Sequence, residues 1–336
     1  MPSRCDSSRG IPTKIDTEAA VKLGWIGIHE EGIPALDAVC SAGYQVQGVM
    51  TLAKAAAADR AGSACYADIC RPYHLPVYEV NHVNEDSSLE ILRAWDCDVL
   101  VVLGWGQILS PEVLRLPKIG AVGAHASLLP RNPGSAPVSR AIINGESQTG
   151  NSLIWLMPDV DAGDVIDQRS FPISSYDTCR TIYDAVAESN RDMLLSVLPK
   201  LADGIIPGVA QPGSDAAFLP RRGPRDGKID WQNSTSQIYN LIRAVTRPYP
   251  GATTEFRGQT FKIWTAAAMP EFNTGLAPGT VIGPVRSPRA ESCGQLIATS
   301  DGAILILEAE NGVGRVIGGR ELCEQNWTQR GVANAA

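Results

Sequence analysis

Long apolar runs, a hydrophobic signal segment and paired cysteine motifs are all missing from this 336-residue sequence. No apolar segment reaches the roughly 18–20 residues that span a bilayer, so we expect no membrane partner. Residues 1–20 mix charges, proline and small polar side chains, which indicates a disordered leader and no secretion signal. The eight cysteines include no Cys-x-x-Cys pair, which favours reduced thiols, a cytoplasmic location and no metal site.

Positive charge is scarce as well. The chain has 29 lysines and arginines against 36 acidic residues, a formal net charge of −7. A protein that binds a polyanion normally presents a clustered basic face. The composition therefore predicts no nucleic-acid partner.

Strands and helices alternate after the leader. The apolar segments 21–28 and 44–52 flank the amphipathic segment 33–43, which is the pattern of a βαβ unit with a parallel sheet. Segment 97–105 is apolar throughout, as expected for a central strand covered on both faces. Further strands are expected at 76–80, 119–125, 151–158 and 164–173, with helices at 135–145 and from 179 to about 202. The sequence predicts an α/β domain with a Rossmann-like parallel sheet over residues 21–204.

Composition changes after Gly204. Residues 205–224 are rich in proline and glycine and lack periodicity, which predicts a linker. Residues 225–330 contain one short amphipathic helix and then short alternating strands separated by turn residues. This pattern predicts a smaller C-terminal domain that is mostly β, resembling an OB-like barrel.

The densest group of chemically useful residues lies between 120 and 166. His125 directly follows an apolar strand, so we expect it at the carboxyl edge of the sheet, where open α/β folds bind ligands. Asp161 and Asp164 follow a later strand in an Asp-Ala-Gly-Asp turn. An imidazole beside a carboxylate is suited to proton transfer. The residues alone leave open a second interpretation, in which the histidine satisfies a loop carbonyl and the aspartates serve the turn.

These segments resemble the formyltransferase superfamily, which depends on N10-formyltetrahydrofolate. Its signature is Asn-x-His-x-Ser-Leu-Leu-Pro, followed about 36 residues after the histidine by an aspartate in a Leu-Asp-x-Gly turn. This sequence has His-Ala-Ser-Leu-Leu-Pro at 125–130 and Asp161 in Val-Asp-Ala-Gly. The resemblance runs from about residue 22 to beyond 265 and implies a folate-dependent one-carbon transferase.

The resemblance implies a role for each residue of the signature. His125 moves protons, and Asp161 fixes His125. The family asparagine, which donates a hydrogen bond to the oxygen of the tetrahedral intermediate, is replaced by Gly123. Loss of one such donor typically costs about 10²–10³ in rate. Asn132, the Gly123 N–H or an ordered water can take its place, or the site has been rebuilt to transfer a different group.

The resemblance also implies binding residues. The folate is expected along two loops, and the substrate at the first-strand turn and the loop after His125. The expected folate-binding residues are Leu103, Gly104, Trp105, Ile108, Leu109, Val160 and Asp164, and the expected substrate-binding residues are His29, Ser127 and Arg131.

The opening segment 27–52 is most similar to the nucleotide-linked amino-sugar N-formyltransferases. The branch that acts on methionyl-tRNA carries a basic, glycine-rich insertion after the second strand, whereas residues 53–84 here contain only Lys54, Arg60 and Arg71. We therefore expect a small-molecule amine substrate, a nucleotide-linked amino sugar, and leave a homodimer open. A methionyl-tRNA formyltransferase and a non-catalytic folate- or ligand-binding protein are the alternatives, and retention of both His125 and Asp161 argues against the latter.

Overall fold

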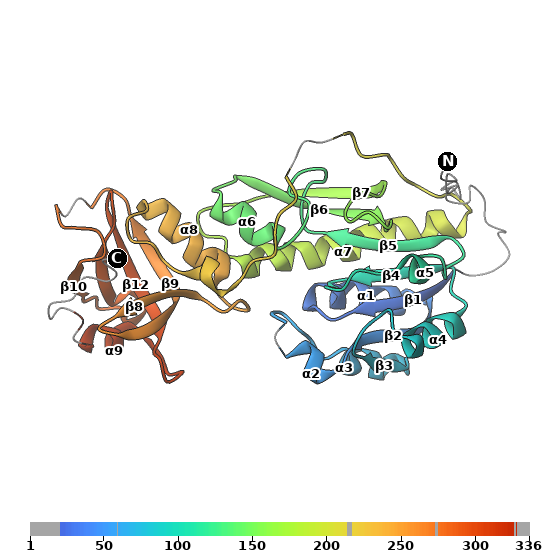
Figure 1. Cartoon of the computed structure of the whole chain (residues 1–336), viewed down its shortest axis with the longest axis horizontal. Helices are drawn as coiled ribbons and strands as arrows, with labels where there is room; N and C mark the ends of the chain where they lie inside the picture. The colour runs from blue at the N-terminus through green and yellow to red at the C-terminus, as the bar shows by residue number, and fades with distance from the viewer. Residues whose placement is uncertain (1–20, 59, 214–216, 273–274, 326, 328–336) are drawn as a thin grey trace, which may run out of the picture. The chain divides into compact units, whose positions relative to one another are not determined.

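The computed structural model describes residues 21–58, 60–213, 217–272, 275–325 and 327 (Figure 1). The expected leader, residues 1–20, lies outside the described residues. Two compact units divide the chain. Among the described residues, the first contains those up to 133, 150–170 and 185–217, and the second contains 134–149, 171–184 and those from 218 onward.

A seven-stranded sheet forms the centre of the first unit, in the order β3-β2-β1-β4-β5-β6-β7. All pairings among the first five strands of the chain are parallel, which confirms the predicted Rossmann-like sheet. The order reverses between β1 and β4, which is where such sheets bind ligands at their carboxyl edge. The strands are β1 (Lys22–Gly27), β2 (Gln45–Leu52), β3 (Val77–Val80), β4 (Val99–Leu103), β5 (Gly120–His125), β6 (Gln148–Trp155) and β7 (Val165–Pro172).

The sheet departs from a wholly parallel arrangement at β6, which runs antiparallel to β5. A parallel neighbour needs a crossover that carries the chain back along the sheet, usually on a helix. The only helix between these strands is α6 (Pro137–Ile143), which has seven residues and belongs to the second unit. The chain therefore enters β6 from the edge at which β5 ends.

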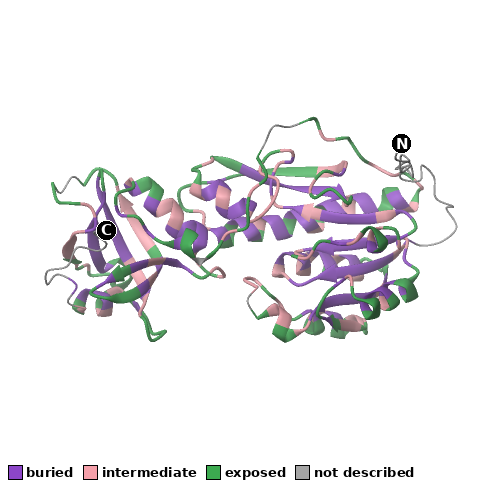
Figure 2. Ribbon diagram, in the orientation of Figure 1, coloured by how far each residue is buried: buried purple, intermediate pink, exposed green. Residues whose placement is uncertain are grey.

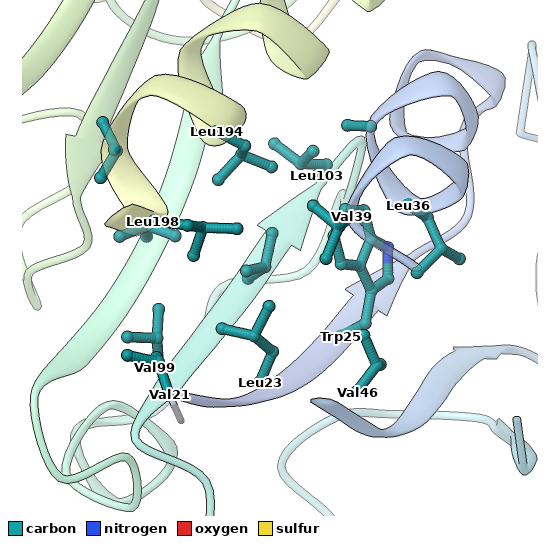
Figure 3. Packing of buried hydrophobic residues seen from close by; sticks show 14 of the residues in the cluster. Val21, Leu23, Trp25, Leu36, Val39, Val46, Val99, Leu103, Leu194 and Leu198 are labelled. Carbon is teal, nitrogen blue, oxygen red and sulfur yellow. The ribbon is translucent and has the colours of Figure 1, made fainter. Parts of the chain in front are cut away.

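Helices cover both faces of this sheet, as the buried strands require. On one face, Leu36 of α1, Leu194 and Leu198 of α7 and Leu23 and Trp25 of β1 belong to one buried apolar cluster (Figure 3). The other face is covered by α4 and α5. Complete burial of each such side chain contributes roughly 1.5–3 kcal/mol. The helices are α1 (Ile33–Ser41), α2 (Lys54–Ala57), α3 (Tyr66–Cys70), α4 (Asp86–Trp95), α5 (Pro111–Leu114) and α7 (Cys179–Ala202).

The second unit contains a six-stranded sheet in the order β10-β11-β12-β9-β8, with β13 beside β12. Its strand pairings are antiparallel, and β11 is buried along its whole length. Buried residues (purple) recur along the strands of this sheet in Figure 2. The predicted mostly-β domain is thus confirmed. Its elements are α8 (Thr235–Val245), β8 (Ala252–Phe256), β9 (Gln259–Met269), β10 (Val281–Val285), β11 (Gly294–Ala298), β12 (Ala303–Glu310), β13 (Val316–Gly318) and α9 (Gly319–Glu324).

None of the helices in the described part of the chain has the length and apolar character needed to cross a membrane.

Candidate active site

His125 is the last residue of β5, at the carboxyl edge of the parallel strands. Side chains alternate between the faces of a strand, so His125, Gly123 and Ala121 share one face. Ala121 belongs to the apolar cluster on the face covered by α4, and Leu156 and Trp105 pack at the margin of the same cluster. His125 therefore lies at the carboxyl edge of the sheet, next to this apolar cluster.

Both ring nitrogens of His125 face oxygen atoms. Its Nδ1 lies 3.4 Å from Oδ1 of Asp161, and both side chains are largely buried. Its Nε2 lies 2.9 Å from the carbonyl oxygen of Asn132. A carbonyl only accepts, so Nε2 carries the hydrogen of this contact.

Asp161 is held by its own turn rather than by a strand. Its backbone adopts the left-handed conformation (φ 57°), which is unusual for a residue other than glycine. The side-chain amide of Gln211 donates to the carbonyl oxygens of Asp161 (2.7 Å) and Gly163 (2.8 Å). Gly163 lies so close to Trp155 that a Cβ would come within 1.7 Å of the Trp155 carbonyl oxygen. Close packing and Gln211 together fix the carboxylate beside His125.

Sequence reasoning missed Gln211, because it lies in the segment 205–224 that we expected to be a linker. One residue of this segment, Val209, pairs with β7. Val165 and Val209 exchange two backbone hydrogen bonds of 2.8 and 2.9 Å. A short isolated bridge has no hydrophobic periodicity, so no sequence signal points to it.

The loop 126–133 is fixed by hydroxyl groups. Ser127 Oγ donates to the carbonyl oxygen of Arg131 at 2.7 Å, and only 1% of Ser127 is exposed. Ser152 of β6 donates to the carbonyl of Ser127 and accepts from the Leu129 N–H. Ser127, expected to bind substrate, thus holds the loop in shape, while Arg131 is exposed.

The place of the family asparagine is filled by an apolar side chain. A Cβ at Gly123 would lie 2.6 Å from Leu156 Cδ2 and 3.1 Å from Leu156 Cγ. Gly123 also pairs with Val102 on one side and Ile154 on the other, so its peptide group lies inside the sheet. Leu156 therefore covers the position from which the family amide would project.

The loop after β4 combines buried and exposed apolar residues. Leu103 is fully buried and Leu109 nearly so, and both are core residues. Gly104 has φ 61°, and a Cβ there would collide with His29. Ile108 is 69% exposed, and the indole N–H of Trp105 is buried without a partner among the described residues.

The second expected folate loop follows β6. Val160 is 45% exposed, and Met157 is also exposed. Asp164 accepts the Trp155 N–H through its carbonyl oxygen at 3.0 Å, and its side chain lies against Gly208. The two expected folate loops thus each expose an apolar side chain.

His29 follows β1 and shapes the first turn. The Glu31 N–H donates to its Nδ1 (3.3 Å), and Glu31 Oε2 lies 3.4 Å from the same atom. Gly62 and Gly104 pack directly against the ring and its Cβ. This close packing gives His29 a role in building the turn, whatever it binds.

No group of three or more histidine, cysteine, aspartate or glutamate side chains that could hold a metal ion occurs among the residues described here.

Comparison with known proteins gives consistent results for the two parts of the chain. Residues 32–198 match the family described as formyl transferase, and residues 223–326 match its C-terminal domain. A methionyl-tRNA formyltransferase from Symbiobacterium thermophilum is 33% identical over 293 residues, which is 86% of this chain and 88% of that protein.

Two solved structures share the fold at low identity. HypX from Aquifex aeolicus in complex with tetrahydrofolic acid has a TM-score of 0.63 at 19% identity. The match covers 87% of this chain but only 44% of HypX. An N-formyltransferase from Helicobacter canadensis in complex with folinic acid and dTDP-3-aminofucose has a TM-score of 0.59 at 18% identity, covering 85% of this chain and 98% of that one.

Proposed function

This chain belongs to the formyl transferase family and is a one-carbon transferase, and we propose that it transfers a formyl group from N10-formyltetrahydrofolate to the amine of a nucleotide-linked amino sugar. The observation that carries the proposal is the His125–Asp161 pair at the carboxyl edge of the sheet.

Formyl transfer to an amine forms one C–N bond, breaks another, and moves one proton from the attacking nitrogen to the departing one. His125 is the group suited to move that proton, because a histidine gains and releases protons near neutral pH. Asp161 lies beside Nδ1 and orients the ring, which leaves Nε2 to exchange its hydrogen. The contact between Nε2 and the Asn132 carbonyl must open for that exchange.

The residues at the two loops fit a folate. Ile108 and Val160 expose apolar side chains that a flat heterocycle would cover. The buried indole N–H of Trp105, without a partner in the described part of the chain, would find an acceptor. The folate would supply the formyl group, and the backbone groups of 103–109 and 158–164 would bind its polar edge.

For the missing amide, we propose Asn132 as the donor to the oxyanion. Its carbonyl contact with His125 keeps this residue beside the imidazole. Gly123 is a weaker candidate, because its peptide group lies in the sheet and Leu156 covers it. An ordered water, or a site rebuilt for another group, is the rival explanation.

A second candidate substrate is methionyl-tRNA, which is favoured by the 33% identical relative. The net charge of −7 and the three scattered cations in 53–84 favour the amino sugar, because phosphate-backbone binding depends on clustered lysine and arginine. Binding of tRNA at physiological salt should therefore be undetectable. A submicromolar affinity that falls steeply with salt would replace the amino sugar by tRNA.

The test is formyl transfer from N10-formyltetrahydrofolate to a panel of nucleotide-linked amino sugars and to charged initiator tRNA. We expect transfer to an amino sugar, and its loss in Asn132→Ala by about 10²-fold. An unchanged rate in Asn132→Ala would reject the relocated amide. Absence of transfer to any amine, with tight folate binding retained, would reject formyl transfer and favour a rebuilt site or a binding protein.

A further inference from the structure

Two arginines in the second unit come together from distant parts of the sequence. Arg140 lies in α6, and Arg222 lies just before the 3-10 helix Pro224–Gly227. The strand-like segment before Arg222 is tied to the start of α6, because the Ser135 N–H donates to the Leu219 carbonyl at 2.9 Å. The guanidinium of Arg140 donates to the Pro220 carbonyl at 3.4 Å.

Neither arginine has a carboxylate partner among the described residues. Arg222 donates to the carbonyl oxygen of Asp226 at 2.7 Å, while the Asp226 carboxylate accepts the Gly223 N–H at 2.7 Å. The Nε–H of Arg140 is completely buried and has no hydrogen-bond partner in the described structure. A buried donor on a charged group is costly to leave unsatisfied, so this atom points to a missing acceptor.

The charges of the two side chains act on each other. Burial and, next, the Arg140 guanidinium lower the pKa of Arg222 below its usual value, against the opposing effect of Asp226. Two partly buried cations side by side destabilise each other unless an anion lies between them. Guanidinium groups match the oxygen geometry of phosphate and bind it through paired hydrogen bonds.

We propose that Arg140 and Arg222 form an anion site that binds a phosphate group. The anion site is argued from side chains of the second unit alone and goes beyond the proposed function. It assigns these arginines to phosphate binding rather than to stabilising the fold. The phosphate can belong to the diphosphate of a nucleotide-linked sugar or to the backbone of an RNA.

A neighbouring arginine, Arg225, provides a matched control. Arg225 lies three residues after Arg222 and is exposed, so it carries the same charge without the burial. The variants Arg140→Met and Arg222→Met keep the length and apolar stem of the side chain and remove only the charge and donors. Unfolding temperatures identify any Arg→Met variant that has lost its fold. Such a variant is replaced in the experiment by Arg→Lys at the same position.

The experiment is calorimetric titration of the full chain, without folate, with inorganic pyrophosphate, a nucleoside diphosphate, the uncharged nucleoside, and a short RNA hairpin. We expect the nucleoside diphosphate to bind at least about tenfold more tightly than the nucleoside. Arg140→Met and Arg222→Met should each weaken it at least about tenfold, and Arg225→Met should not. Tighter binding of the hairpin, lost in the same two variants, would identify RNA as the source of the phosphate.

Equal affinity of wild type, Arg140→Met and Arg222→Met for every phosphate ligand would overturn the anion site. The proposed function fails separately, by the absence of formyl transfer to any amine. Binding of pyrophosphate that depends on both arginines, in a protein without formyl transfer, would uphold the anion site while rejecting the reaction.

Discussion

Restoring the family asparagine at Gly123 should fail unless Leu156 is shortened at the same time. A Cβ at Gly123 would lie 2.6 Å from Leu156 Cδ2, which is closer than two non-bonded carbon atoms approach in proteins. Overpacking of this kind costs about 1–3 kcal/mol, less where a flexible side-chain end can rotate away. Replacing glycine inside a strand by alanine returns roughly 0.5–1 kcal/mol. Gly123→Ala should therefore lower the free energy of unfolding by up to about 2 kcal/mol.

A double-mutant cycle isolates this contact. Leu156 is only partly buried, so Leu156→Ala alone should cost about 1–2 kcal/mol, below the range for a fully buried leucine. In the Leu156→Ala background the clash is absent, and Gly123→Ala should be neutral or stabilising. We expect a coupling free energy of about 1–3 kcal/mol between the two positions.

The activity assay uses the same logic with asparagine. Gly123→Asn alone should not raise formyl transfer, because its amide would meet the Leu156 side chain. The Gly123→Asn, Leu156→Ala double variant should raise transfer at least about tenfold over Leu156→Ala, since one oxyanion donor is worth about 10²–10³. The cycle is measured by denaturant unfolding, and additivity within about 0.5 kcal/mol would refute the steric argument. An increase in transfer by Gly123→Asn alone would refute it as well.

Three further predictions concern the site and the thiols. His125→Asn and Asp161→Ala should each reduce turnover by at least about 10²-fold in a protein that still folds, and near-wild-type single-turnover rates would reject the proton-transfer pair. Gln211→Ala should lower kcat by about tenfold and raise KM by less, because it frees the turn that holds the Asp161 carboxylate. Gln211→Glu keeps the size of the side chain but loses the amide donor, so it should have the same effect. Burial raises the pKa of Cys179 to about 12, so iodoacetamide at pH 8 should label the exposed Cys65 first, and equal labelling of both in the folded protein would contradict the burial.

The parts of the fold that follow from periodicity could be predicted from the sequence. The apolar segment 97–105 contains β4, which is buried on both faces, and the helix expected from Cys179 to about Ala202 has those bounds. The carboxyl-edge position of His125 follows in the same way, because the residue at the end of a parallel strand lies at the carboxyl edge of the sheet. Such features depend on the hydrophobic pattern within a single segment, which can be read directly from the sequence.

The features that escaped prediction depend on contacts between distant residues. The antiparallel direction of β6 depends on the connection after β5, whose helix is short. The filling of the space at Gly123 depends on Leu156, which is an ordinary apolar residue in the sequence. The hydrogen bond from the Ser127 hydroxyl to the Arg131 carbonyl has no local sign in the sequence, and substrate binding by Ser127 stays a prediction.

The contact between His125 and the Asn132 carbonyl makes the imidazole a tether for the loop 126–133. A ligand that takes the Nε2 hydrogen must first break this contact, so its affinity includes the free energy of breaking it. Thermodynamic linkage makes the effect reciprocal: whatever holds the loop in its present position weakens the ligand by the same factor, and whatever draws Asn132 away strengthens it. Binding at the histidine and the conformation of the loop are therefore one coupled equilibrium, and a substitution in the loop far from the imidazole can change affinity without touching the ligand.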